Sequence, residues 1–498
     1  MGASSDIGHL VRVYWSLFLG NSVEWYEFAV YGYLEPFLEE HFFRGSAMAA
    51  WMGFAVTFLA RPLGGIVLGA VGDSLGRSAA VNLSIVGMLL GTCGQGMLPT
   101  YSSGSETLGN IGVVLLVMLR FLQGLSAAGE ISTISTYITE LGPAKYLGRS
   151  TSLISITVNM GFLSAKGVTY ATSVLLGDEA VRSWGWRVPF IFALVPSLVA
   201  IVGRRGLPES PVFLEHKAAE KQVERGESGA GGEDAEQSYQ DGSENEPMPG
   251  RRPTASVCEQ LAPHRPNICI GMGGVASFAI LQYGGFVWIQ SYLAKRGLSA
   301  ECRMLTGLCS RGLMILLAPL VGWLTDIKGV AWVTFVGACL LAGCGLPLFK
   351  ILEAYPTDPI VAVLVVGVGF ALLGAIGGTG FHYYVVELFP TPVRGVAVGI
   401  SYNIGFSLFG GLAPIVAQAL LKVSPVGPGW LLSFGGFFTA GIVLSSLCMQ
   451  RQGVVKLTHL RNEPYFSSCR LCGSLGDGSP DDPSPEDSSS GGSANTSE

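Results

Sequence analysis

Twelve apolar stretches, each long enough to form a membrane-spanning helix, most constrain how this chain folds. About 20 apolar residues in an α-helix cross the hydrocarbon core of a bilayer. The first six stretches cover residues 11–33, 49–71, 79–98, 112–134, 150–175 and 187–204, and the second six cover residues 267–293, 303–325, 330–350, 359–383, 394–421 and 429–449. The sequence therefore predicts an all-α membrane protein with 12 transmembrane helices in two six-helix bundles.

The composition supports a membrane protein. Only 13% of the 498 residues are charged, whereas soluble domains carry about 25%. The net charge of −6 comes largely from a central polar segment and the C-terminal tail, so it indicates no nucleic-acid partner. Most of the ten cysteines lie in apolar stretches, and the one close pair, Cys469 and Cys472, has no second pair to complete a metal site. We expect no bound metal.

The polar segments divide the chain into four regions. We predict an N-terminal six-helix bundle over 1–207, a cytoplasmic central loop over 208–264, a C-terminal bundle over 265–450 and a cytoplasmic tail over 451–498. The loop and the tail are poor in apolar residues, so we expect both to be largely disordered. Placing both termini in the cytoplasm puts most Lys and Arg residues on the inner side. The central loop and the tail supply this excess, and in the short loops the bias nearly vanishes.

The two halves repeat each other weakly. A loop motif at Gly69, Asp73, Gly76 and Arg77 returns 253 residues later at Gly322–Gly329, which includes Asp326. In such a motif the glycine allows close helix approach, and the aspartate accepts hydrogen bonds from helix N-terminal amides or pairs with a basic residue. We predict a gating contact at the inner face; a solvated ion pair in a simple turn is the alternative. Paired halves are typical of secondary transporters, whose site lies between the halves at mid-membrane.

The first span carries two carboxylates, Glu24 and Glu27. A carboxylate inside a bilayer is costly unless it faces a polar cavity or a partner, so its presence indicates function. At 3.6 residues per turn, Asn21, Glu24, Glu27 and Tyr31 share about a third of the helix circumference. We predict that this stripe faces a pathway and that Glu24 and Glu27 handle protons. The alternative is a permanent ion pair with a neighbouring span.

Several motifs resemble one known family. The loop motif resembles the signature of the major facilitator superfamily, and the remaining matches resemble its metabolite:proton symporters, which include proline/betaine, 2-oxoglutarate, citrate and shikimate carriers. The matching segments are residues 20–32, 61–65, 123–124, 129–130, 184–190, 208–213, 387–390 with Arg394, and 402–405. The chain departs from the family pattern where Ser78-Ala79-Ala80 follow the loop motif, where Val330 follows Gly329, and where Glu27 replaces the usual aspartate.

Basic residues inside the spans are candidates for binding a solute carboxylate. Arg120 shares a helix face with Gln123 and Glu130, and a guanidinium in a wet cavity binds a carboxylate through two hydrogen bonds. A structural ion pair is the alternative for Arg120, and snorkelling to the membrane surface is the alternative for Lys166. The predicted substrate-binding residues are Asn21, Tyr31, Arg61, Arg120, Gln123, Lys166, Arg311, Tyr402 and Asn403; Glu130 joins Glu24 and Glu27 as a proton-coupling candidate.

Together, the residues and the resemblance predict a symporter. We expect a monomer in the lipid bilayer of the plasma membrane that carries protons with a small carboxylate-bearing or zwitterionic metabolite, by alternating access. The proton gradient is the expected energy source, because no Gly-x-x-x-x-Gly-Lys-Ser/Thr phosphate-binding motif is present. We expect no cofactor and no enzymatic activity. The alternatives are a sugar-porter-like facilitator and a nutrient sensor that transports nothing.

Overall fold

The computed structural model describes residues 2–75, 77–204, 259, 261–390 and 393–451. Within these ranges the chain forms helices joined by short turns, and no β-strand. The predicted central loop and tail lie mostly outside the described residues. The same holds for Gly76 of the loop motif, and the side chains of Asp73 and Arg77 are likewise not described.

The N-terminal half contains eleven described α-helices. They are α1 (Gly2–Val13), α2 (Trp15–Tyr33), α3 (Glu35–Phe42), α4 (Ala47–Leu75), α5 (Arg77–Gln95), α6 (Glu106–Ala127), α7 (Glu130–Leu141), α8 (Leu147–Leu176), α9 (Asp178–Ser183), α10 (Val188–Phe192) and α11 (Leu194–Arg204), with short 3₁₀ turns η1 (Tyr101–Ser103), η2 (Ala144–Tyr146) and η3 (Gly185–Arg187).

In the described part of the C-terminal half, α-helices alternate with short 3₁₀ and π-helical segments. They are η4 (Ala262–His264), α14 (Arg265–Gly274), α15 (Ala276–Ile280), η5 (Leu281–Trp288), α16 (Ile289–Lys295), α17 (Ala300–Lys328), α18 (Val330–Ala354), α19 (Pro359–Ala362), η6 (Val363–Phe370), α20 (Ala371–Thr379), α21 (Phe381–Glu387), α22 (Arg394–Gly405), η8 (Phe406–Gly411), α23 (Ala413–Val423) and α24 (Gly427–Arg451).

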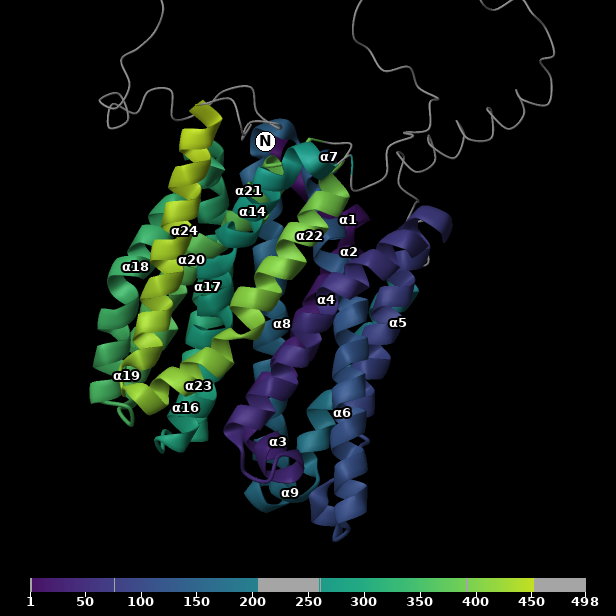
Figure 1. Ribbon diagram of the computed structural model, residues 1–498, viewed down its shortest axis with the longest axis vertical. Coiled ribbons are helices and arrows are strands. Elements are labelled where there is room, and N and C mark those ends of the chain that lie inside the picture. Colours follow the sequence, from purple (N-terminus) through teal and green to yellow (C-terminus); the bar gives the residue numbers. More distant parts are fainter. Residues whose placement is uncertain (1, 76, 205–258, 260, 391–392, 452–498) are drawn as a thin grey trace, which may run out of the picture.

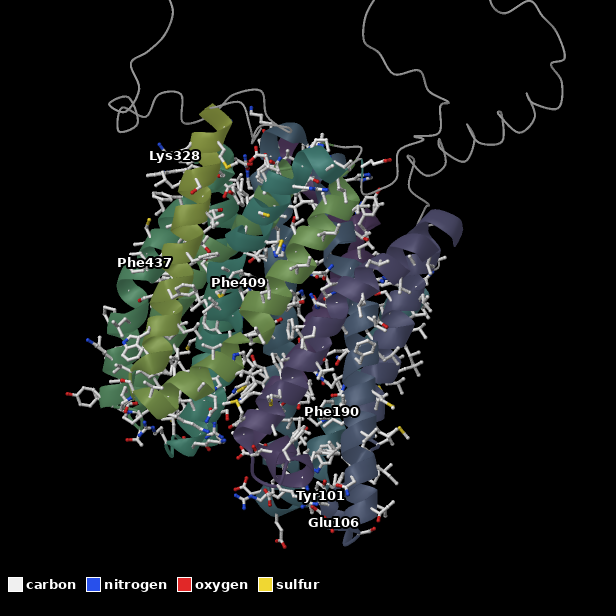
Figure 2. All side chains as sticks on the ribbon, viewed as in Figure 1. Tyr101, Glu106, Phe190, Lys328, Phe409 and Phe437 are labelled. Carbon is white, nitrogen blue, oxygen red and sulfur yellow. The ribbon has the colours of Figure 1, made fainter. Side chains whose placement is uncertain are left out.

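These helices supply the predicted 12 spans. Nine described helical stretches are long and apolar enough to cross a membrane. The other three are α2, α5 and α8, which have 19, 19 and 30 residues. Exposed apolar side chains cover the outside of the bundle, among them Phe437 on α24, which points away from the helices (Figure 2). This surface suits lipid tails, so the prediction of a 12-helix membrane protein in two six-helix bundles is confirmed.

The two halves stand side by side, with α8 between them (Figure 1). Helix α8 packs against α2 in its own half and against α17 in the other, and α4 packs against η8 and α23 across a second seam. We call the lower end in Figure 1, which carries α3, α9 and α16, the α3 end. The upper end, which carries α1, α7 and α21, is the α7 end. Any solute site between the halves lies between these two ends.

Three spans of the C-terminal half contain π-helical turns. These are η5, η6 and η8. A π turn inserts an extra residue into the helical ladder and often marks a functional position. The segment η5 carries Gln282 and Tyr283, and η8 carries Phe406 and Ser407, at the seams with the N-terminal half.

Candidate functional site

Glu24 on α2 forms an ion pair with Arg61 on α4. Arg61 Nη2 donates to Glu24 Oε1 over 2.6 Å, and both side chains are fully buried. Glu24 Oε2 and Arg61 Nε and Nη1 have no well-formed hydrogen bond to any described residue. Tyr283 and Tyr402 of the other half lie within electrostatic range of the pair. A buried pair with unused donors and acceptors has the capacity to bind a proton, water or solute group.

Glu27 lies inside the N-terminal half and contacts hydroxyl groups. Thr92 Oγ1 donates to Glu27 Oε2 over 2.7 Å, and Ser197 Oγ donates to Oε1 over 3.2 Å. Gln123 Nε2 donates to Thr92 Oγ1 over 2.9 Å, and Arg120 Nη1 donates to Gln123 Oε1 over 2.9 Å. A continuous chain of hydrogen bonds therefore joins Glu27 to Arg120 across α2, α5 and α6.

Arg120 is held by carbonyl oxygens. Its Nη2 donates to the carbonyl of Phe54 over 2.9 Å, and its guanidinium carbon lies 4.2 Å from the centre of the Tyr31 ring. Among the described residues Arg120 forms no ion pair with a carboxylate. Within the described residues, Arg120 therefore lacks the structural ion pair with an acidic residue that was the alternative to a role in substrate binding.

Lys166 and Arg311 lie close together at the seam between the halves. Lys166 on α8 donates from Nζ to Gln290 Oε1 over 2.8 Å. Arg311 on α17 donates from Nη1 to Asn159 Oδ1 and to Gln282 Oε1, each over 3.0 Å. Tyr33 is a further neighbour of its guanidinium, while Nη2 has no well-formed hydrogen bond to a described residue. Each cation thus bonds to a neutral amide oxygen of the opposite half, and Arg311 bonds also to Gln282 of its own half. Two buried cations without a described acidic partner favour an anionic group between them.

An aromatic cluster surrounds Tyr283 beside these cations. The Tyr283 ring lies 4.9 Å from Phe58, 6.4 Å from Trp25 and 6.4 Å from Phe162, and its hydroxyl has no partner among the described residues. Phe162 also stacks against the guanidinium of Arg311 at 4.2 Å. Aromatic faces attract cations, including quaternary ammonium groups. The site therefore places two cations, which suit a negative group of a solute, next to aromatic rings, which suit a positive group.

Contacts between the halves close the α3 end of the site. Lys295 on α16 pairs with Glu39 on α3, with Nζ and Oε2 2.6 Å apart. One turn earlier on each helix, the Ser291 hydroxyl donates to Glu35 Oε2. Both contacts join the N-terminal half to the C-terminal half.

The α7 end is closed around Asp326. Asp326 Oδ1 accepts from the backbone amide of Gly148 at the start of α8 over 2.7 Å, and Oδ2 accepts from Arg149 Nε over 2.8 Å. Gly148 and Gly322 make this approach possible, because a Cβ on Gly148 would lie 2.5 Å from the carbonyl oxygen of Gly322. The site is thus enclosed by cross-half contacts at both ends.

Other predicted site residues lie in helix-packing contacts. Asn21 donates to Thr157 on α8, and the Tyr31 hydroxyl donates to the carbonyl of Ala50. Glu130 pairs with Arg204 rather than with Arg120, and both side chains are buried. Asn403 donates across the seam to the carbonyl of Ala128 over 2.9 Å. Their roles in binding and proton coupling stay predictions.

Sequence reasoning did not single out several polar partners at the site. Asn159 and Gln290 hold the two seam cations, and Thr92 and Ser197 hold Glu27. The sequence indicated these four residues only by their hydrophilic side chains inside apolar spans. Among the described residues no group of three His, Cys, Asp or Glu side chains is arranged to hold a metal ion.

Known proteins are similar to this chain over most of its length. Residues 14–449 match the family described as "Sugar (and other) transporter". The ectoine/proline transporter ProP of Corynebacterium glutamicum is 30% identical over 417 residues, which cover 81% of this chain and 77% of the relative. The glycine betaine/proline/ectoine/pipecolic acid transporter OusA of Dickeya dadantii is 28% identical over 433 residues, covering 84% and 79%.

Solved structures share the fold. The major facilitator superfamily proton:xylose symporter XylE, bound to 6-bromo-6-deoxy-D-glucose, superposes with a TM-score of 0.63 at 17% identity, covering 91% of this chain and 97% of that one. At this identity the likeness concerns the arrangement of helices alone.

Proposed function

This chain belongs to the sugar (and other) transporter family of the major facilitator superfamily, and we propose that it is a proton-coupled symporter of a small carboxylate-bearing zwitterion of the proline/betaine type. It is an integral multi-pass membrane transporter and not an enzyme. The observation that carries the proposal is the seam site, where Lys166 and Arg311 lie beside the Tyr283 aromatic cluster and the Glu24–Arg61 pair.

The seam cations are suited to the carboxylate of the solute. Arg311 Nη2 has no well-formed hydrogen bond to a described residue, and the neighbours of the two cations are uncharged: amide oxygens and Tyr33. A carboxylate placed between them would form charge-assisted hydrogen bonds to both halves. Because each half contributes one cation, binding would draw the halves together and couple occupancy to closure.

The aromatic cluster is suited to the positive end of a zwitterion. Proline, glycine betaine and ectoine, which appear in the names of the relatives, each carry a carboxylate and a positively charged nitrogen. Phe162 contacts both Arg311 and the ring group around Tyr283, so a ligand a few atoms long would reach from cation to aromatic face. This arrangement favours a zwitterion over an uncharged sugar.

Proton coupling is assigned to the two buried carboxylates of α2. Glu24 has one oxygen free of hydrogen bonds from described residues and faces the seam, so it exchanges protons with the solute site. Glu27 is bonded to uncharged groups and is connected to Arg120 through Thr92 and Gln123. A proton on Glu24 would release Arg61 to interact with the solute, which links proton and solute binding.

In the proposed orientation the α7 end faces the cytoplasm, and both termini lie on that side of the plasma membrane. Opening the α3 end admits the solute and a proton. Closing it and breaking the Asp326 contacts then opens the α7 end and releases both, as alternating access requires. We propose that the protein works as a monomer without a cofactor, with the proton gradient as its energy source.

Uptake of labelled proline and glycine betaine into proteoliposomes tests the proposal. An inward proton gradient should drive accumulation, and a Glu24→Gln variant should retain exchange while losing the response to the gradient. Glu106→Gln, the same chemical change in an exposed ion pair with Arg44, is the matched control. Uptake that ignores the gradient would indicate a facilitator. Binding without flux in proteoliposomes would indicate a sensor.

A further inference from the structure

Glu35 is a buried carboxylate at the very end of the bundle. It is the first residue of α3, directly after the turn that ends α2, and its side chain has no exposed surface. The Ser291 hydroxyl of the other half donates to Glu35 Oε2. Glu35 Oε1 has no well-formed hydrogen bond to any described residue. Ser291 lies on α16 and not on the N-terminal half, so separation of α3 from α16 would remove the hydrogen-bond partner of Glu35 and open its cross-half side to water.

The titratable groups that act on Glu35 come from three helices. Glu39, one turn later on α3, adds a negative charge; Lys295 on α16 adds a positive charge; and Tyr31 on α2 is neutral. Lys295 is already engaged by Glu39, over 2.6 Å. Burial, reinforced by Glu39, raises the pKa of Glu35 from 4.5 to about 7, although Ser291 and Lys295 lower it. A proton on Glu35 would give its Oε1 a hydrogen to share with Glu39.

We propose that Glu35 is a second proton-binding site of this transporter, separate from Glu24 and Glu27, which takes up a proton as the α3 end closes and releases it to the same side as that end opens. The proposal rests on the alternating access proposed above only in requiring that α3 and α16 separate. Separation exposes Glu35 to water and removes the cause of its raised pKa. The open state then carries an ordinary, ionised glutamate at neutral pH.

The sign of the pH effect follows from this difference. Between pH 4.5 and about 7 the closed state holds one more proton than the open state. The equilibrium constant for closing therefore falls up to tenfold for each unit of pH increase in this window, and it changes little below or above the window. Because the proton returns to the side from which it came, Glu35 changes the rate of the cycle and leaves the number of transported protons unchanged.

Spin-label distances across the α3 end test this proposal without any transport measurement. A non-natural amino acid at the exposed positions Glu40 on α3 and Ser299 at the start of α17 accepts labels without touching the native cysteines. Pulsed electron resonance on the full chain in lipid nanodiscs, from pH 5 to pH 8.5, reports the fraction of molecules with a short distance. We expect the short-distance fraction to fall as pH rises, with the steepest change below about pH 7.

Two variants assign the titration to Glu35. Glu35→Gln is neutral at every pH, so it should keep the short distance throughout the range. Glu106→Gln, the same chemical change in an exposed ion pair with Arg44 at the same end, should behave as the unmodified protein. A pH response that persists in Glu35→Gln, or an unmodified protein whose distance does not depend on pH, would overturn the proposal. A pH response in a protein that transports nothing would sustain this proposal and refute the proposed function.

Discussion

Lys166 and Arg311 meet at the seam although they come from opposite halves of the protein. The methylene chain of Lys166 lies against Gly307, where an added Cβ would be 3.2 Å from Lys166 Cγ, and Arg311 follows Gly307 by one helical turn on α17. The Tyr33 ring lies 4.8 Å from the Lys166 ammonium. Glycine at position 307 therefore allows Lys166 to pack closely against α17, near enough for Arg311 to act on its charge, and this is the basis for the proposed carboxylate site.

Replacing Arg311 should weaken solute binding. Arg311→Gln removes the charge and is expected to raise KM for glycine betaine by about tenfold to a hundredfold, because a charge-assisted hydrogen bond contributes about 1.5–3 kcal/mol. Arg311→Lys keeps the charge and should lose less. Uptake kinetics in proteoliposomes measure the effect, with Arg303→Gln on the same helix for comparison. An unchanged KM in Arg311→Gln would place the carboxylate elsewhere.

Replacing Glu24 and replacing Arg61 should reduce the stability of the fold by different amounts. Glu24→Gln leaves Arg61 buried and charged, since arginine stays protonated, and should destabilise the fold by about 3–5 kcal/mol. Arg61→Met should cost less, because Glu24 is able to bind a proton and become neutral. Thermal unfolding in detergent, followed by tryptophan fluorescence, compares the two variants.

The Glu24→Leu/Arg61→Met double variant sharpens this comparison. It should regain most of the stability, because an apolar pair replaces the buried ions, but it should not couple uptake to a proton gradient. If Arg61→Met unfolds at a lower temperature than Glu24→Gln, the assignment of Glu24 as a proton-binding residue would be wrong.

A methyl group at Gly148 should prevent closure of the α7 end. In Gly148→Ala the new Cβ would lie 2.5 Å from the Gly322 carbonyl oxygen and 2.8 Å from Asp326 Oδ1. Overpacking of this kind costs about 1–3 kcal/mol, enough to shift the closed-to-open ratio by about fivefold to a hundredfold. Spin labels at Lys145 and Lys328 should show a longer distance, together with slower uptake.

Gly167→Ala is the matched control for the α7 end. Gly167 lies on the same helix α8, and no heavy atom would lie within 4 Å of its added Cβ. Distance and uptake in this variant should match those of the unmodified protein. The same distance in Gly148→Ala as in Gly167→Ala would show that α8 and α17 do not need to touch at this point.

Removing the Ser291 hydroxyl should shift the titration of the α3 end to higher pH. The hydrogen bond from Ser291 stabilises the ionised form of Glu35 and so lowers its pKa. In Ser291→Ala the pKa of Glu35 should rise above about 7, and the closed state should persist to higher pH. The labelled pair at Glu40 and Ser299 measures the midpoint. A midpoint that moves to lower pH would show that Ser291 acts on closure through packing alone.

The class of protein was predictable from sequence because membrane helices are read from local properties. Lipid contributes no hydrogen bonds, so each span satisfies its own backbone groups as a mainly apolar helix, and the twelve stretches are visible without tertiary information. The resemblance to metabolite:proton symporters is confirmed by relatives named as proline, betaine and ectoine transporters. Substrate residues and proton-coupling residues were named by the same local logic, as polar groups in apolar surroundings, and remain predictions.

Partnerships were harder to predict, because they join residues far apart in the chain. Glu24 and Glu27 share one helix face, yet Glu24 meets Arg61 and Glu27 meets Thr92 and Ser197. Glu130 was grouped with Arg120 on a helix face, but the helix is interrupted between α6 and α7, and Glu130 pairs with Arg204. Periodicity gives the direction of a side chain around its own helix and not the identity of the helix it faces.

The sequence alone determined that this chain is a two-fold repeated bundle of 12 spans with charged residues inside it, since each of those properties is local. The tertiary structure decided which charges are paired and which are not. It brought Lys166 to Arg311 across the seam, and it buried Glu35 against Ser291 at a distance of 256 residues along the chain. The reason is physical: the cost of a buried charge depends on what the other half of the protein places beside it, and that is set only when the halves pack together.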